Sequence, residues 1–196
     1  MEEEIWTWEN CGEKIKSLSG RLGFPEAPYL KFLKLRLSLE DGSIHDELRN
    51  KPFKKVEPIY CILTGYANAK HIPEKGELIS FSKLPGGGPY KSVFIERVAK
   101  PVESFFGSNP GMLYEITKIF NCSRLDYGDC SVKIYSLPLV PIVYILWGET
   151  SEFPASANVL FDATITNYLT TEQVVLLSEL TTRRMIHAYR ILREKN

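Results

Sequence analysis

The chain has 196 residues, of which 44% are hydrophobic and 24% are charged, as in ordinary globular proteins. Lys and Arg together number 24, and so do Asp and Glu, so no excess of positive charge argues for a nucleic-acid or anionic-membrane partner. This length fits one domain, and we expect a single globular domain over residues 1–196 that buries its core without disulfides.

The N-terminal segment MEEEIWTWEN is acidic and amphipathic. A secretory signal would need a basic start followed by an apolar core, and this segment has neither. The longest apolar run, from Val140 to Trp147, is much shorter than the ~20 residues that cross a bilayer. We therefore predict a cytoplasmic protein without a membrane partner.

The four cysteines show no spacing typical of a metal or redox site. They are Cys11, Cys61, Cys122 and Cys130, and no two are separated by only two residues. Cys122 and Cys130 could meet across a loop, and whether they pair or bind metal stays open. Reduced thiols fit a cytosolic protein, and we predict no metal site.

The first third of the chain changes from a helical to a strand-like period. Apolar residues recur every three or four positions over residues 2–22, which predicts a helix. Leucines at 33, 35, 37 and 39 then alternate with polar residues, as in a strand with one solvent-exposed face. Residues 40–43 predict a turn to a second strand near Ile44. We interpret His45, among acidic neighbours, as a solvated loop or edge residue.

Proline and glycine divide the middle of the chain. Pro58 opens a predicted helix that ends near residue 69, and residues 77–81 form a short extended segment. The run LPGGGP at 84–89 lacks the Lys-Ser/Thr of a phosphate loop, so a tight turn into a helix explains it better. That helix has a predicted break at Pro101. A further helix over 109–120 is followed by a polar loop over 121–129.

The most apolar stretch is 136–169, whose only charges are Glu149, Glu152 and Asp162. Strands are predicted at 132–136, 142–147 and 158–166. The sequence TTEQ at 170–173 is a capping box that opens the last helix. Arginines 183, 184, 190 and 193 are interleaved with acids, which favours a solvated face over a nucleic-acid helix. Together these elements predict an α+β fold, a mainly antiparallel sheet covered by helices.

Five residues are candidates for a ligand-binding pocket: Tyr90, Arg97, Trp147, Glu152 and Asp162. Tyr90 and Arg97 fall on one helical face, where a guanidinium among apolar residues calls for a carboxylate partner. The acids of the apolar stretch are available, and Trp147 supplies an aromatic wall. The alternative is structural: Glu152 and Asp162 cap loops or pair with Arg97, and Trp147 fills the core.

Three islands of sequence carry a family resemblance. The first is Leu84-Pro85-Gly86-Gly87 with Tyr90, Phe94, Arg97, Pro101 and Phe106-Gly107, and the second is Gly128-Asp129. The third comprises Leu137-Pro138, Pro141, Leu146-Trp147, Glu152-Phe153-Pro154 and Leu160-Phe161-Asp162. With these motifs the chain resembles the family called domain of unknown function 3786, found in anaerobic bacteria and archaea.

The resemblance implies no established activity. Some members carry an N-terminal cysteine-rich iron–sulfur domain like that of corrinoid proteins, which implies a link with anaerobic corrinoid or one-carbon metabolism; that domain is not part of this sequence. The loop before Glu-Phe-Pro is commonly more acidic in the family, often with an Asp pair. Here it reads Gly148-Glu149-Thr150-Ser151-Glu152, which argues against metal binding by this loop.

Three function classes stay open. The first is an accessory protein that binds a small molecule or a cofactor of unknown identity, and it predicts one deep pocket. The second is an enzyme that uses Glu152 and Asp162 as a carboxylate pair, roughly 5–10 Å apart across a cavity. The third is an adaptor for a partner protein, which predicts an exposed apolar patch without a pocket. We favour the first class, because no nucleophile–base pair is evident in the sequence.

Overall fold

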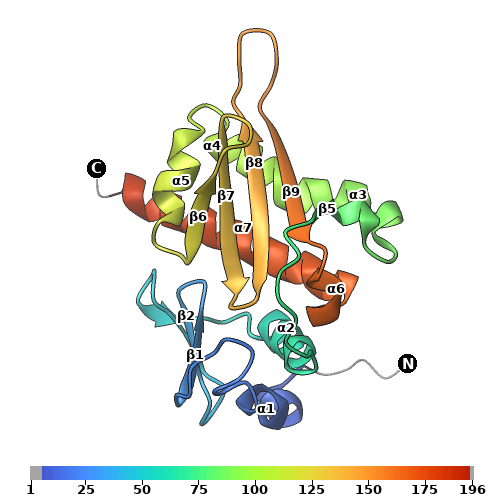
Figure 1. The fold of residues 1–196 in the computed structure, drawn as a ribbon. Helices are drawn as coiled ribbons and strands as arrows, with labels where there is room; N and C mark the ends of the chain where they lie inside the picture. The colour runs from blue at the N-terminus through green and yellow to red at the C-terminus, as the bar shows by residue number, and fades with distance from the viewer. Residues whose placement is uncertain (1–5, 195–196) are drawn as a thin grey trace.

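Two antiparallel sheets form the frame of the protein, in a computed structural model that describes residues 6–194 (Figure 1). The smaller sheet has the strand order β1-β2-β3-β4, and the larger has the order β5-β9-β8-β7-β6. Buried side chains from both sheets and from the helices belong to one hydrophobic core. The predicted α+β class with antiparallel sheets is therefore confirmed. The domain limits of 1–196 stay a prediction.

The smaller sheet consists of β1 (Tyr29–Phe32), β2 (Leu35–Ser38), β3 (Ile44–Asp46) and β4 (Lys51–Pro52). The leucine alternation at 33–39 predicts one strand, but a turn at Leu33 and Lys34 divides this segment. Both turn residues have positive φ, 48° and 59°, which matches the right-handed twist of a tight hairpin at some steric cost. The predicted hairpin, whose second strand lies near Ile44, is confirmed as the antiparallel pair of β2 and β3.

The larger sheet consists of β5 (Leu78–Ser80), β6 (Cys122–Leu125), β7 (Cys130–Leu137), β8 (Val140–Trp147) and β9 (Ser156–Asp162). β8 lies at the centre, and all its residues except Trp147 are buried, which explains its unbroken apolar sequence. Pro141, which has no N–H to donate, lies opposite Tyr135 beside a register shift in β7.

The helices are α1 (Trp8–Lys16), α2 (Glu57–Ala67), α3 (Gly87–Phe94), α4 (Lys100–Phe106), α5 (Gly111–Thr117), α6 (Ile165–Tyr168) and α7 (Thr171–Arg193). Figure 1 shows α3, α4, α5 and α7 on one face of the larger sheet, whereas α1 and α2 lie beside the smaller one. The predicted capping box at the start of α7 is present, with Thr170 and Gln173 bonded reciprocally.

The chain between residues 81 and 106 follows the predicted turn and helix with one difference. A short 3-10 helix, η1 (Phe81–Lys83), precedes the turn. A Cβ at Gly87 would collide with the carbonyl oxygen of Phe81, so this glycine permits a close approach of two backbone segments. The expected break at Pro101 is absent. The helix instead widens into one π-helical segment, η2 (Ile95–Ala99), directly before α4.

Three predicted elements have other limits. α1 begins at Trp8, and the part of the predicted helix before Trp6 lies outside the described residues. The segment predicted as a polar loop over 121–129 contains edge strand β6. β9 ends at Asp162, and α6 takes the place of its predicted last residues. Within residues 6–194, no helix is both long enough and apolar enough to cross a membrane.

Candidate functional site

The five residues of the predicted pocket lie on separate parts of the larger sheet and its covering helices. Tyr90 in α3 is 64% exposed, and Trp147 at the end of β8 is 39% exposed. Glu152 lies in the exposed loop between β8 and β9. Asp162, in contrast, is 3% exposed. Among the described residues, none of the five lines the cavity described below.

Arg97 has a different carboxylate partner from those predicted. Its Nη1 lies 3.2 Å from Oε1 of Glu179 in α7, and the Arg97 side chain is 61% exposed. Neither Glu152 nor Asp162 pairs with it in the described structure. The Glu179 side chain is only 13% exposed, and it pairs with both Arg97 and Arg183.

Asp162, the last residue of β9, binds the segment that leads into the edge strand β5. It accepts hydrogen bonds from the backbone N–H groups of Lys75 (3.2 Å), Gly76 (2.7 Å) and Thr164 (3.0 Å), and from the Thr164 hydroxyl (2.6 Å). Burial alone would raise the pKa of the Asp162 carboxyl, but these hydrogen bonds outweigh burial and lower it. With four donors on two oxygens, this carboxylate has a complete structural role.

Glu152 and Asp162 lie toward opposite ends of β9. Trp147 pairs with Ser156 at the end nearest the loop that carries Glu152, whereas Asp162 is the last residue of the strand. At about 3.3 Å per residue, the strand places Ser156 and Asp162 roughly 20 Å apart. Figure 1 shows the β8–β9 loop projecting away from the end of β9 that leads into α6. This separation does not suit paired-carboxylate catalysis, which needs about 5–10 Å.

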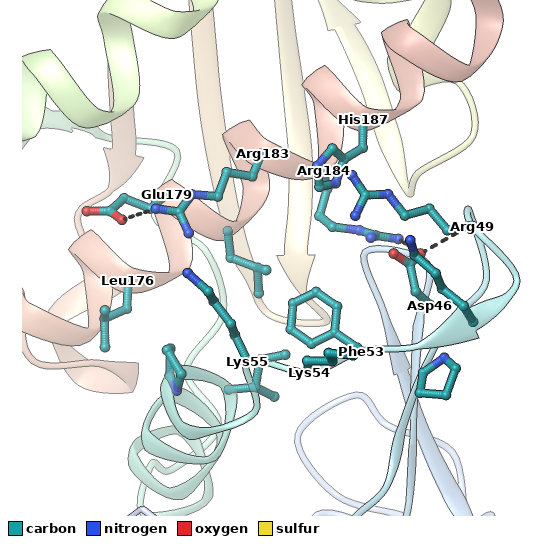
Figure 2. Close-up of a pocket in the computed structure, with 15 residues that line it drawn as sticks. Asp46, Arg49, Phe53, Lys54, Lys55, Leu176, Glu179, Arg183, Arg184 and His187 are labelled. Carbon is teal, nitrogen blue, oxygen red and sulfur yellow. Dashed lines mark hydrogen bonds and ion pairs between the residues drawn. The ribbon is translucent and has the colours of Figure 1, made fainter. Parts of the chain in front are cut away.

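A cavity of about 640 Å³ lies elsewhere, between α7 and the segment that leads from β3 through β4 to α2 (Figure 2). We call it the basic cavity. Its charged and polar lining residues are Asp46, Arg49, Lys51, Lys54, Lys55, Glu179, Arg183, Arg184 and His187. Its apolar lining residues are Pro52, Phe53, Pro58, Ile59, Leu176 and Leu180. The volume falls within the range of small-molecule sites, roughly 300–1,000 Å³.

Arg184 forms the buried wall at one end of the basic cavity and is 1% exposed. Its Nε donates to the Leu33 carbonyl (2.9 Å), and its Nη2 donates to the Lys34 carbonyl (3.1 Å) and to Oδ1 of Asp46 (2.7 Å). The guanidinium therefore supports the left-handed β1–β2 turn and joins α7 to the smaller sheet. Its Nη1 is buried without a hydrogen-bond partner.

Asp46 is the carboxylate that compensates Arg184. It is 2% exposed, and it also accepts hydrogen bonds from the backbone N–H groups of Leu48 and Arg49. Burial raises the pKa of Asp46, but the hydrogen bond and charge of Arg184 and the two N–H groups lower it by more, so the carboxyl has a pKa below its ordinary value. Asp46 therefore remains ionised, and its Oδ1 accepts all three of these hydrogen bonds.

The charges around the basic cavity do not balance. Six lining side chains are cationic and two are acidic, and both acids already have partners in Arg184, Arg183 and Arg97. No described carboxylate lies within ion-pair distance of Arg49, Lys51, Lys54 or Lys55. Figure 2 shows Lys55 and Arg183 extending toward one another from opposite walls. The basic cavity is therefore lined by an excess of cationic side chains together with apolar ones.

His187 lies one turn after Arg184 on α7, and its Nδ1 is buried without a hydrogen-bond partner. Burial, together with the positive charges of Arg49 and Arg184, lowers the pKa of His187 to about 4, against the small opposing effect of Asp46. The ring is therefore neutral near pH 7. It adds a hydrogen-bonding group, and no charge, to this end of the cavity.

Sequence reasoning missed the basic cavity. It placed Arg184 on a solvated face, although Leu177, Thr181, Arg184 and Ala188 recur at steps of three and four and are all buried. That spacing could have indicated that Arg184 lies on the buried face of the last helix. For Asp46, Arg49, Phe53 and Lys55 no local signal existed, because their shared site depends on how the smaller sheet packs against α7.

The cysteines do not form the pair left open by the sequence. Cys122 in β6 lies opposite Ile134, and Cys130 in β7 lies opposite Leu146, so the ladder does not place them together. Neither forms a disulfide. Over residues 6–194 no group of three His, Cys, Asp or Glu side chains could hold a metal ion. Burial raises the pKa of the Cys130 thiol, which makes it a poor nucleophile.

Comparison with known families places the chain in one of them. The model of the family described as "Domain of unknown function (DUF3786)" matches residues 22–184, and the chain therefore belongs to that family. The match covers both sheets and most of α7, including Arg184 but not His187. Comparisons with curated proteins and with solved structures gave no match.

Proposed function

We propose that the protein binds a small organic anion in the basic cavity, as a binding or accessory protein. The observation that supports this proposal is the uncompensated positive charge of a cavity large enough for a small molecule. Arg49, Lys51, Lys54 and Lys55 surround apolar side chains, and an anionic ligand with an apolar body would satisfy both features.

The sequence predicted a small-molecule or cofactor-binding protein. This proposal keeps that class of function but assigns the binding site to the basic cavity instead of the predicted five-residue pocket. The link to anaerobic corrinoid or one-carbon metabolism comes from the family resemblance alone and stays a prediction. The five-residue pocket around Tyr90 and Arg97 also stays a prediction. Arg97 is not a lining residue of the basic cavity, but it pairs with Glu179, which is one.

A charge-matched set of fragments tests the proposal. We expect phenyl sulfate to bind the isotope-labelled protein and to shift amide resonances of residues 49–59 and of 176–187 in NMR titrations. Benzylammonium, which has a similar ring and the opposite charge, should not bind. Charge reversal by Arg49→Glu or Lys51→Glu should weaken phenyl sulfate binding about fivefold to tenfold, which corresponds to about 1–1.4 kcal/mol.

Lys91→Glu is the matched control, because Lys91 is an exposed lysine of α3 that does not line the cavity. It should leave the affinity unchanged. Equal binding of phenyl sulfate and benzylammonium, or resonance shifts confined to other parts of the protein, would show that the basic cavity is not an anion site.

A further inference from the structure

The two ends of the basic cavity differ in how well their charges are satisfied. At the Arg183 end, Glu179 pairs with Arg183 and Arg97, both of which are exposed, so water screens the remaining charge. At the Arg184 end, the buried guanidinium pairs with Asp46 through its Nη2, but its Nη1 has no acceptor, and Arg49 has no described carboxylate within ion-pair distance. An anion gains more from a cation at low local dielectric, so the Arg184 end is the stronger anion subsite.

His187 belongs to the same end. Its unpartnered Nδ1 and the unpartnered Arg184 Nη1 stand one helical turn apart on α7. Buried polar atoms without a protein partner are rare in native proteins, and many of those that occur bind a water molecule or an ion. Two such atoms at one end of one cavity indicate hydrogen-bonding capacity that the protein itself does not use.

On this basis, and resting on the proposed function, we propose that the ligand's anionic group binds where His187, Arg49 and Arg184 meet, and that His187 takes up a proton as it binds. The charged groups that face His187 are Arg184 and Arg190 from α7, and Asp46 and Arg49 from β3 and the turn after it. Lys51 of β4 lines the same cavity. Cations thus outnumber the single acid, and burial together with these cations keeps the imidazole neutral in the unliganded protein.

A bound anion changes that balance. Its negative charge offsets Arg49 and Arg184 and favours the imidazolium, which then donates a charge-assisted hydrogen bond. The sign follows from linkage: His187 has a higher pKa in the complex, so binding is strongest below that pKa and weakens as the pH rises through it. If binding restores the ordinary value of about 6.5, affinity should be roughly tenfold higher at about pH 5.5 than at about pH 8.

The test uses phenyl sulfate, whose own charge is constant over this pH range, so its titration does not contribute. We expect tighter binding at the lower pH for the parent protein and no pH dependence for His187→Gln. In NMR spectra, the titration midpoint of the His187 ring should move to higher pH when phenyl sulfate is added. His71→Gln, a histidine outside the basic cavity, serves as the control and should behave as the parent.

The outcomes separate this inference from the proposed function. Binding with equal affinity at both pH values, or pH dependence that persists in His187→Gln, would overturn proton uptake by His187 while leaving anion binding intact. Failure of phenyl sulfate to bind the parent protein at either pH would overturn both. Near-UV circular dichroism of each variant at both pH values shows that its fold is retained, and the ring titration of the parent gives a readout that needs no variant.

Discussion

Within residues 6–194, two ion pairs join α7 to other elements, and one is buried whereas the other is exposed to solvent. Arg184 and Asp46 join α7 to the smaller sheet, with side chains that are 1% and 2% exposed. Glu179 and Arg97 join α7 to η2, and the Arg97 side chain is 61% exposed. The nitrogen–oxygen distances are similar, 2.7 and 3.2 Å. Distance alone therefore says little about the contribution of either pair.

The difference lies in what remains when one partner is removed. An exposed pair leaves a hydrated charge, and such pairs contribute only about 0–1 kcal/mol. Removal of Arg184 would leave the Asp46 carboxylate buried, with the carbonyls of Leu33 and Lys34 also losing their donor. We therefore expect the free energy of unfolding to respond strongly at one pair and weakly at the other.

The largest effect should come from Arg184→Ala. We expect it to lower the free energy of unfolding by about 3–5 kcal/mol, because a buried charge loses its partner. Urea unfolding at neutral pH measures this loss. Arg184→Lys keeps the charge but not the planar donor fork, so it should cost less, about 1–3 kcal/mol, and it remains measurable if the alanine variant does not fold.

Arg183→Ala is the matched control, since it removes the neighbouring arginine from the exposed side of the same helix turn. It should change the free energy of unfolding by no more than about 1 kcal/mol. Equal losses in the Arg183 and Arg184 variants would show that burial does not distinguish the two sites.

A smaller effect is expected for the pH dependence of the free energy of unfolding. The pKa of His187 is about 4, below its ordinary value of 6.5, so the unfolded chain binds a proton more readily than the folded protein between these values. Stability should therefore fall as the pH drops from about 6.5 to about 4, by roughly 1–2 kcal/mol after allowance for solvent screening. Urea unfolding across this range measures the fall.

His187→Gln should remove this part of the pH dependence, because glutamine has no proton to bind here. His45→Gln, in β3 and outside the basic cavity, is the control. The interpretation would be wrong if the His187 and His45 variants lost stability with the same slope as the parent protein.

The smallest effect should come from the exposed pair. Arg97→Ala should lower the free energy of unfolding by about 0.2–1 kcal/mol in dilute buffer, and this difference should shrink in about 1 M NaCl, where charges are screened within about 3 Å. Thermal unfolding at low and high salt measures both values. A loss that is large or independent of salt would mean that Arg97 acts through packing and not through Glu179.

The fold could be predicted wherever local chemistry decides the structure. The capping box at Thr170, the apolar run of β8 and the glycine turn before α3 each define their own element. Errors arose where long-range packing decides. The turn at Leu33 and Lys34 adopts positive φ with Arg184 donating to its carbonyls from the other end of the chain.

The candidate site was harder to predict than the fold. Glu152 and Asp162 were singled out because acids are conspicuous in an apolar stretch, yet Asp162 proved to be a structural acceptor for backbone N–H groups. Phe53 and Lys55 are unremarkable in sequence. They become part of a site only because α2 and β4 place them opposite α7.

The hydrogen bonds of Arg184 also bear on the order of events during synthesis. They join residues 138 to 151 positions apart in the chain. A ribosome releases the smaller sheet long before it releases α7, and α7 must emerge before the β1–β2 turn gains its donor. We therefore expect the first third of the nascent chain to remain incompletely folded, and accessible to chaperones, until α7 packs against it.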